Sequence, residues 1–90
     1  MSAQRENALV ALKKARSLLD KIIKMIEGEE YCVNVMQFNL AALGLLKSAH
    51  LSLMENHLNT CFLAAVDADN KKKKAEMVKE ILEVTKLAQR

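Results

Sequence analysis

The chain has 90 residues, a formal net charge of +3, no proline, no tryptophan and only two glycines. This length allows a single domain, and the dominance of Ala, Leu, Lys, Glu and Met favours helices over strands. No stretch approaches the ~18 uncharged apolar residues of a membrane span, and the first residues lack a signal-type apolar core. Two cysteines in such a chain are typical of reduced thiols. We therefore expect an all-α, cytoplasmic protein with no membrane association.

The first predicted helix runs from about residue 3 to residue 27. Apolar side chains recur at helical spacing from Ala8 to Ile26 and fill one broad arc of the helical wheel. Lysines fill much of the opposite arc, so this helix is amphipathic with one basic side. Gly28 is expected to end it by adopting the left-handed conformation.

The second predicted helix runs from about residue 31 to residue 65, which is long for a chain of this size. A wheel centred on Cys32 places one stripe of side chains within roughly 40° of it. If Cys32 faces Cys61 of a second copy packed antiparallel, the two helices cross near residue 46. Gly44 lies close to this crossing, where a missing side chain would let two backbones approach. The other members of the stripe are Met36, Leu43, His50, Met54, His57 and Cys61.

The third predicted helix runs from about residue 71 to residue 88. Either Asp69 or Asn70 is a candidate for its N-cap. The four lysines Lys71–Lys74 lie in or before its first turn, where cations oppose the helix dipole. Part of this lysine run is therefore expected to be loop.

Cys32, His57 and Cys61 carry the strongest chemical signal in the sequence. His57 and Cys61 are four residues apart and share one side of a helix, whereas Cys32 lies roughly 37 Å earlier along the same helix. One helix cannot bring the three side chains to one ion, but two antiparallel copies can. Two thiolates and an imidazole suit Cu(I) or Zn better than Mg or Ca. The spacing thus predicts a metal site shared between chains and a homo-oligomer.

Other residues near this pattern have two interpretations each. His50 is an interface histidine or a spare ligand, since it lies two turns before His57. Met36 and Met54 are core residues or thioether donors to Cu(I). Tyr31, beside Cys32, either forms a hydrogen bond that supports the metal ligands or is a half-buried residue at the start of the helix.

Charge is distributed unevenly along the chain. Residues 1–26 carry six basic and two acidic side chains, residues 27–70 carry one basic and six acidic, and residues 71–90 carry seven basic and three acidic. The basic ends indicate either a surface for an anionic partner or simply solvated helix faces. The sequence shows no Gly-rich phosphate loop, no Ser-His-Asp set and no paired carboxylate in an apolar pocket, so we expect a sensor or binding module and not an enzyme.

The pattern Tyr31-Cys32, His57-Leu58 and Cys61, between a basic helix and a short third helix, resembles the copper-sensitive operon repressor (CsoR) family. The resemblance covers about residues 12–87, and its Cys–His–Cys spacing matches the copper-sensing branch. It implies an antiparallel helical dimer that pairs into a tetramer, binds operator double-stranded DNA through a basic face of the first helices, and binds DNA more weakly with metal bound.

The resemblance also implies roles for individual residues. Cys32 would be the ligand from one protomer, and His57 and Cys61 the ligands from the other. Tyr31 matches the family's tyrosine that supports the metal ligands by hydrogen bonding. The glutamate that supports the ligand histidine falls on Glu80, with Glu76 one turn earlier as the alternative.

The chain departs from the family in its first helix. Ala11 stands where the family has a leading arginine, and Ser17-Leu18 stands in place of a Gly-Gln pair, so the hydrogen bonds of that glutamine are lost. The remaining candidates for phosphate contacts are Lys13, Lys14, Arg16 and Lys21, with Lys71–Lys74 as an auxiliary.

Three functions compete on this evidence. The leading prediction is a Cu(I)-sensing repressor released from DNA by copper. The second is a reactive-sulfur sensor in which Cys32 and Cys61 of facing protomers are joined by a disulfide or polysulfide. The third is a copper-binding helical oligomer that has lost DNA binding.

Overall fold

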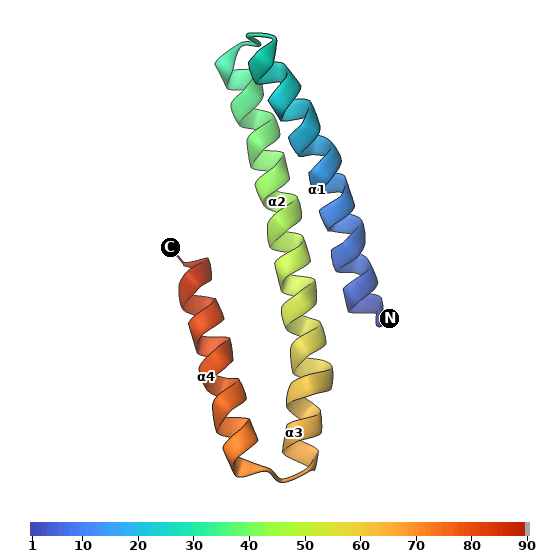
Figure 1. Cartoon of the computed structure of the whole chain (residues 1–90), viewed down its shortest axis with the longest axis vertical. Coiled ribbons are helices and arrows are strands. Elements are labelled where there is room, and N and C mark those ends of the chain that lie inside the picture. The colour runs from blue at the N-terminus through green and yellow to red at the C-terminus, as the bar shows by residue number, and fades with distance from the viewer. Residues whose placement is uncertain (90) are drawn as a thin grey trace. The chain divides into compact units, whose positions relative to one another are not determined.

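A computed structural model describes residues 1–89 of the chain, and every regular element among them is helical (Figure 1). The all-α prediction is therefore confirmed. The chain divides into two compact units, Met1–Asn56 and His57–Arg90. None of the helices among the described residues is long and apolar enough to cross a membrane. The elements, in chain order, are α1 (Ala3–Glu27), α2 (Cys32–His57), a π-helical turn (Leu58–Phe62), α3 (Leu63–Asp67) and α4 (Lys71–Ala88).

Helix α1 spans the range that the sequence predicts, and a hydroxyl caps its start. The Ser2 Oγ accepts a hydrogen bond from the Arg5 backbone N–H at 3.1 Å, which satisfies one of the free donors of the first turn. The end of the helix differs from the expectation. Gly28 has a φ of −87°, whereas Glu29 has a φ of 57°. The prediction of a left-handed Gly28 is therefore wrong by one residue.

The turn after α1 explains this difference. The N–H of Glu29 bonds to the carbonyl of Ile26, and the N–H of Glu30 bonds to the carbonyl of Met25. This is the Schellman pattern, in which the first residue past the cap is left-handed. Gly28 is the C-cap itself, so the left-handed residue is Glu29. Residues other than glycine rarely adopt this conformation, so the sequence did not indicate Glu29 as the left-handed position.

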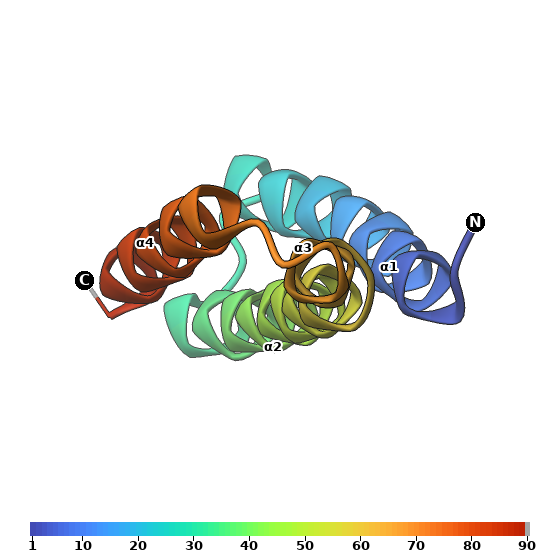
Figure 2. The same cartoon turned by 90° about the horizontal axis from the view of Figure 1, so that it is seen from below.

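Helices α1 and α2 pack side by side in opposite directions (Figures 1 and 2). Ser2 bonds to Asn56 at one end, and the Lys21 ammonium lies over the Phe38 ring toward the other. Between them, Ala8, Ala11 and Ala49 form one buried cluster. These contacts show that α1 and α2 pack antiparallel.

Small residues at seven-residue spacing form this contact. Ala8, Ala15 and Ile22 are buried on α1. On α2 the buried residues are Ala42, Ala49 and Asn56, which we call the alanine face. A seven-residue repeat keeps one stripe of each helix against its neighbour, and alanines let the two backbones approach closely.

The second helix is less uniform than the sequence predicts. The expected single helix over residues 31–65 is α-helical only to His57, continues as a π-helical turn, and returns to α geometry until Asp67. A π-turn inserts one extra residue into a helical turn. No glycine or proline marks residues 58–62, so the sequence carried no breaker signal for this change.

In the second unit, α3 contacts α4, and Ala65 and Met77 are its buried apolar residues. The side chain of Asn70 caps α4 by accepting a hydrogen bond from the Lys73 N–H at 3.0 Å, so Asn70 rather than Asp69 is the N-cap. All of Lys71–Lys74 is helical, and the expectation of a partly looped run is wrong. Lys74 offsets its unfavourable position in the helix dipole by pairing with Asp69 at 3.5 Å.

Candidate functional site

The two ends of α2 carry the first two candidate ligands. Cys32 is its first residue and His57 its last. The two residues are therefore separated by the length of a 26-residue helix, roughly 37 Å along its axis. Both Cys32 and Cys61 are free, exposed thiols. Each thiol is therefore accessible to a metal or to another chain.

The ligand candidates of α2 lie on a side that α1 does not cover. The stripe Cys32, Met36, Leu43, His50 and His57, which we call the ligand face, is offset by one position from the alanine face, about 100° around the helix. Met36 keeps 55% and Leu43 45% of their surface exposed. Cys32 is also exposed, and both histidines are half-buried. This apolar stripe with donor atoms is thus open in the single chain.

His57 and Cys61 flank the change in helix type. His57 precedes the π-helical turn, and Cys61 lies within it. The Cys61 Sγ is 3.6 Å from the Thr60 Oγ1. The spacing of four residues therefore spans a widened turn instead of a regular α-helical one.

Within residues 1–89, the single chain gathers no group of three or more His, Cys, Asp or Glu side chains able to hold a metal ion. The structure thus does not bring Cys32, His57 and Cys61 together, and their role as a ligand set stays a prediction.

The residues predicted to hydrogen-bond to the ligands also lie at the surface. Tyr31 is 68% exposed and its carbonyl accepts hydrogen bonds from the N–H groups of the first turn of α2. Glu76 and Glu80 are exposed on α4, and the described part of the chain gives neither carboxylate a hydrogen-bond or ion-pair partner. The choice between these two glutamates stays open.

The candidate DNA contacts fall into two groups. Lys13, Lys14 and Arg16 are exposed on α1. Lys21 is different, because its ammonium lies 4.1 Å from the centre of the Phe38 ring of α2, a cation–π contact that holds it against the helix pair.

The altered positions of α1 differ in their surroundings. Ala11 is 7% exposed and belongs to the alanine cluster between α1 and α2. Leu18 is half-buried, whereas Ser17 is exposed. Ala11, where the resemblance implies an arginine, is therefore part of the packing core in this chain.

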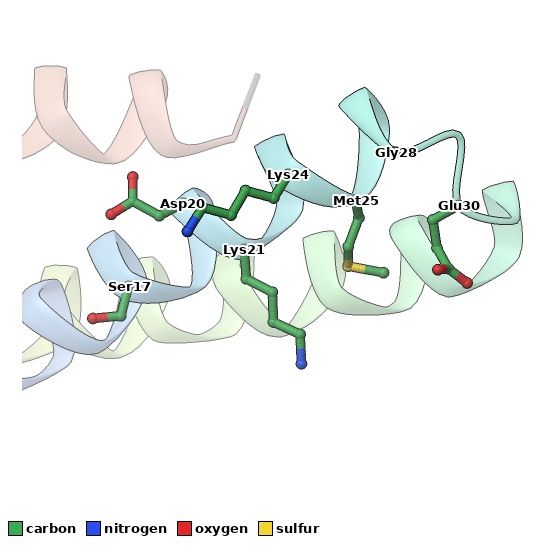
Figure 3. Close-up of a pocket in the computed structure, with 7 residues that line it drawn as sticks. All are labelled: Ser17, Asp20, Lys21, Lys24, Met25, Gly28 and Glu30. Atoms are coloured by element: carbon green, nitrogen blue, oxygen red, sulfur yellow. The ribbon is translucent and has the colours of Figure 1, made fainter.

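A shallow pocket lies at the C-terminal end of α1 (Figure 3). It has a volume of about 480 Å³ and an open mouth. Its lining mixes two lysines with two carboxylates and contains neither Cys nor His, so its chemistry does not match the soft site. The sequence did not indicate this pocket. Its lining residues are Ser17, Asp20, Lys21, Lys24, Met25, Gly28 and Glu30.

Sequence reasoning also missed a polar contact beside His57. The Ser2 hydroxyl donates a hydrogen bond to the Asn56 Oδ1 at 2.6 Å, and Asn56 is only 7% exposed. The available signal was the seven-residue spacing of Ala42, Ala49 and Asn56, which places a polar residue on a packing stripe.

Comparison with known proteins places these features in a family. The family model for metal-sensitive transcriptional repressors matches residues 4–87. The copper-sensing transcriptional repressor CsoR of Mycobacterium ulcerans (strain Agy99) is 44% identical over 66 residues, which are 73% of this chain and 56% of that protein. CsoR of Mycobacterium tuberculosis (strain ATCC 25618 / H37Rv) is 41% identical over the same shares.

A further relative is the copper-sensing transcriptional repressor RicR of the same M. tuberculosis strain, 32% identical over 63 residues, 70% of this chain and 66% of RicR. The matched part spans little more than half the length of the CsoR relatives. The family is one of repressors and not of enzymes, as the sequence predicts. With a model match over nearly all of its residues, this chain belongs to the metal-sensitive transcriptional repressor family.

Proposed function

We propose that this protein is a Cu(I)-sensing repressor that leaves its operator DNA, in the cytoplasm, when copper occupies a site made by two chains. The observation that carries the proposal is the ligand face of α2. On this face Cys32 and large apolar residues such as Met36 and Leu43 are exposed, and the histidines are half-buried. Relatives of this chain are named copper-sensing transcriptional repressors.

The donor set supports copper over harder metals. Two thiolates and one imidazole are soft ligands, and Cu(I) favours thiolate sulfur. Both thiols are free and exposed, so neither needs to leave a disulfide or a packed core before binding. We expect one three-coordinate Cu(I) per protomer, with two sulfur atoms and one nitrogen atom as neighbours.

Helix length supports a site shared between chains. Cys32 and His57 lie at opposite ends of α2, so one helix cannot place both on one ion. In an antiparallel pair of α2 helices, each end that carries Cys32 lies beside an end that carries His57 and Cys61. The apolar residues of the ligand face would be buried in the same dimer, which compensates for the small core of a short chain.

Gly44 supports the same dimer. A Cβ atom built on Gly44 meets nothing within 4 Å in the single chain, so the packing of α1 and α2 does not require a glycine there. Glycine inside a helix costs up to ~1 kcal/mol relative to alanine. A close approach of a second α2 near its midpoint would compensate for this cost. Such dimers would pair further into tetramers.

The basic face of α1 is the proposed operator contact. Lys13, Lys14 and Arg16 are exposed on α1 and are not among its buried residues, so they can reach phosphates without disturbing α2. Phosphate contacts fix orientation but carry no sequence information, so this face predicts affinity and salt dependence and not the operator sequence.

Anaerobic titration with Cu(I), followed by X-ray absorption and by binding to a duplex of the promoter region of its own gene, tests this function. We expect two sulfur and one nitrogen neighbours, tight DNA binding without copper, and release on adding one Cu(I) per chain. Only oxygen and nitrogen neighbours would overturn the copper site. Equal DNA affinity with and without bound copper would overturn the repressor mechanism.

The same assay separates the two alternatives. Release by a polysulfide but not by Cu(I), with Cys32 linked to Cys61 of the partner protomer, would identify a reactive-sulfur sensor, for which the two exposed thiols are suited. Cu(I) binding without any DNA binding at low salt would identify a copper-binding oligomer and point to the altered residues Ala11 and Ser17-Leu18.

A further inference from the structure

Asn56 is the one polar side chain that is buried among the described residues. It occupies the last position of the alanine face, where Ala42 and Ala49 pack against α1. A buried amide is costly unless it is hydrogen-bonded. The Ser2 hydroxyl supplies such a bond to the Asn56 Oδ1 at 2.6 Å. The polar residue on this packing stripe is thus tied to the start of α1.

The same hydroxyl also caps α1. The Ser2 Oγ accepts a hydrogen bond from the Arg5 N–H at 3.1 Å while its O–H points to Asn56. A serine hydroxyl has one donor and two acceptor positions, so both bonds can form together. The cap of the basic helix and the buried amide of α2 therefore share one atom, and both lie within Met1–Asn56.

The position of Asn56 gives this contact a consequence. Asn56 directly precedes His57, the candidate ligand at which the α-helix ends and the π-helical turn begins. A rotation of the backbone at His57 acts first on the peptide of Asn56, whose side chain is fixed at the cap of α1.

We propose that the Ser2–Asn56 hydrogen bond, the latch, couples the ligation state of His57 to the first turn of α1 and hence to the DNA-binding face. This inference rests on the proposed function. Ser2 and Asn56 act here as positioning residues, because neither would touch the metal or the DNA. Without the latch, both ligands still bind, but each affects the other less.

Three single variants and one double variant isolate the latch. Asn56→Ala continues the alanine face and leaves the Ser2 cap in place. Ser2→Ala removes both the cap and the latch, while Ser2→Thr keeps the hydroxyl and serves as the matched control. In the double variant Ser2→Ala/Asn56→Ala, the loss of coupling should equal that of either single change, because each single change already breaks the Ser2–Asn56 hydrogen bond.

The first measurement is the ratio of affinities for the promoter duplex without and with Cu(I), using protein without an N-terminal tag. Wild type and Ser2→Thr should show a ratio of about 5 to 150. Asn56→Ala and Ser2→Ala should lower this ratio to about a third or less of the wild-type value, with Cu(I) stoichiometry unchanged. Ratios in both variants that equal the wild-type ratio would overturn the latch.

The second measurement does not need DNA. Cu(I) should change the hydrogen exchange of the first-turn amides of α1, including that of Arg5, in wild type and Ser2→Thr but not in Asn56→Ala. If wild type binds Cu(I) but no DNA, the repressor function fails and amide exchange alone decides the latch. If wild type binds no Cu(I), the proposed function and the coupling fail together.

Discussion

The two faces of α2 differ in composition and in what covers them. The alanine face consists of small residues that are almost fully buried against α1, with Ala42 and Ala49 each 2% exposed. The ligand face, one residue further around the helix, carries large apolar side chains and donor atoms, and α1 leaves it open. One helix thus serves packing within the chain on one side and, in our account, assembly and metal binding on the other.

This contrast explains how a 90-residue chain can combine packing within the chain with assembly and metal binding. Alanines bury little apolar area each, so the helix pair gains close backbone contact but only a modest hydrophobic contribution. The larger apolar residues are reserved for the second face. Its burial by another copy would couple oligomerisation to stability and bring the ligands from two chains together.

The largest expected effect comes from removing a donor on the ligand face. Cys32→Ala or Cys61→Ala should weaken Cu(I) binding by more than about 100-fold, since losing even a residue that only hydrogen-bonds to a ligand costs 10–100-fold. Competition with a colorimetric Cu(I) chelator measures this change. Met36→Leu, on the same face but without a required sulfur, is the control and should stay within about threefold. A loss with Met36→Leu as large as with the cysteines would mean that the donors are assigned wrongly.

The next effect concerns the alanine face. Ala42→Leu inserts a bulky side chain between α1 and α2 and should lower the free energy of unfolding by about 1–3 kcal/mol. Ala41→Leu, at the exposed neighbouring position, is the matched control and should change stability by less than about 0.5 kcal/mol. Urea unfolding at equal protein concentration compares the two. Equal destabilisation by both would show that α1 does not pack on this face.

Gly44→Ala is expected to have a smaller effect, and it distinguishes packing within the chain from packing between chains. In the single chain, a methyl group at this position meets no neighbour within 4 Å, so Gly44→Ala alone should favour the helix by up to ~1 kcal/mol. If a second α2 crosses here, the methyl group raises the dissociation constant of the dimer about fivefold or more, as expected for ~1 kcal/mol of overpacking. Sedimentation equilibrium gives this constant, and an unchanged or tighter dimer would move the crossing elsewhere.

The smallest effects are expected on the basic face of α1. Lys13→Ala should reduce the slope of log affinity for DNA against log salt by about 0.9, the value for one phosphate contact. Lys21→Ala should reduce it by less than half as much, because the Lys21 ammonium is held over Phe38. DNA titrations at several salt concentrations measure both slopes. Equal slopes of log affinity against log salt for the two variants would show that Lys21 contacts DNA despite its contact with Phe38.

Much of the fold could be predicted from the sequence because periodicity and caps are local signals. The range of α1 follows from its apolar spacing and from the turn residues after Glu27. Other features depend on backbone geometry that side-chain patterns do not encode. The left-handed residue is Glu29 and not the glycine beside it, and the π-helical turn follows His57 without any breaker residue.

The candidate site was also only partly predictable from the sequence. Ligand type and helical spacing were enough to name Cys32, His57 and Cys61 as candidates, and the open ligand face agrees with that choice. Sequence spacing did not reveal that Ala11 is a core residue or that Ser2 reaches Asn56, 54 positions away. Such contacts depend on the register between α1 and α2, which the packing of alanines sets.

Subunit mixing shows whether the copper site is built from two chains. A Cys32→Ala chain is mixed with a His57→Ala/Cys61→Ala chain, and Cu(I) binding is measured anaerobically with each chain alone as control. Neither chain alone should form a site with two sulfur atoms and one nitrogen atom. The mixture should restore one such site per heterodimer, because one chain keeps Cys32 and the other keeps His57 and Cys61. No restored site in a verified heterodimer, or a wild-type monomer that binds Cu(I) through all three ligands, would contradict the account.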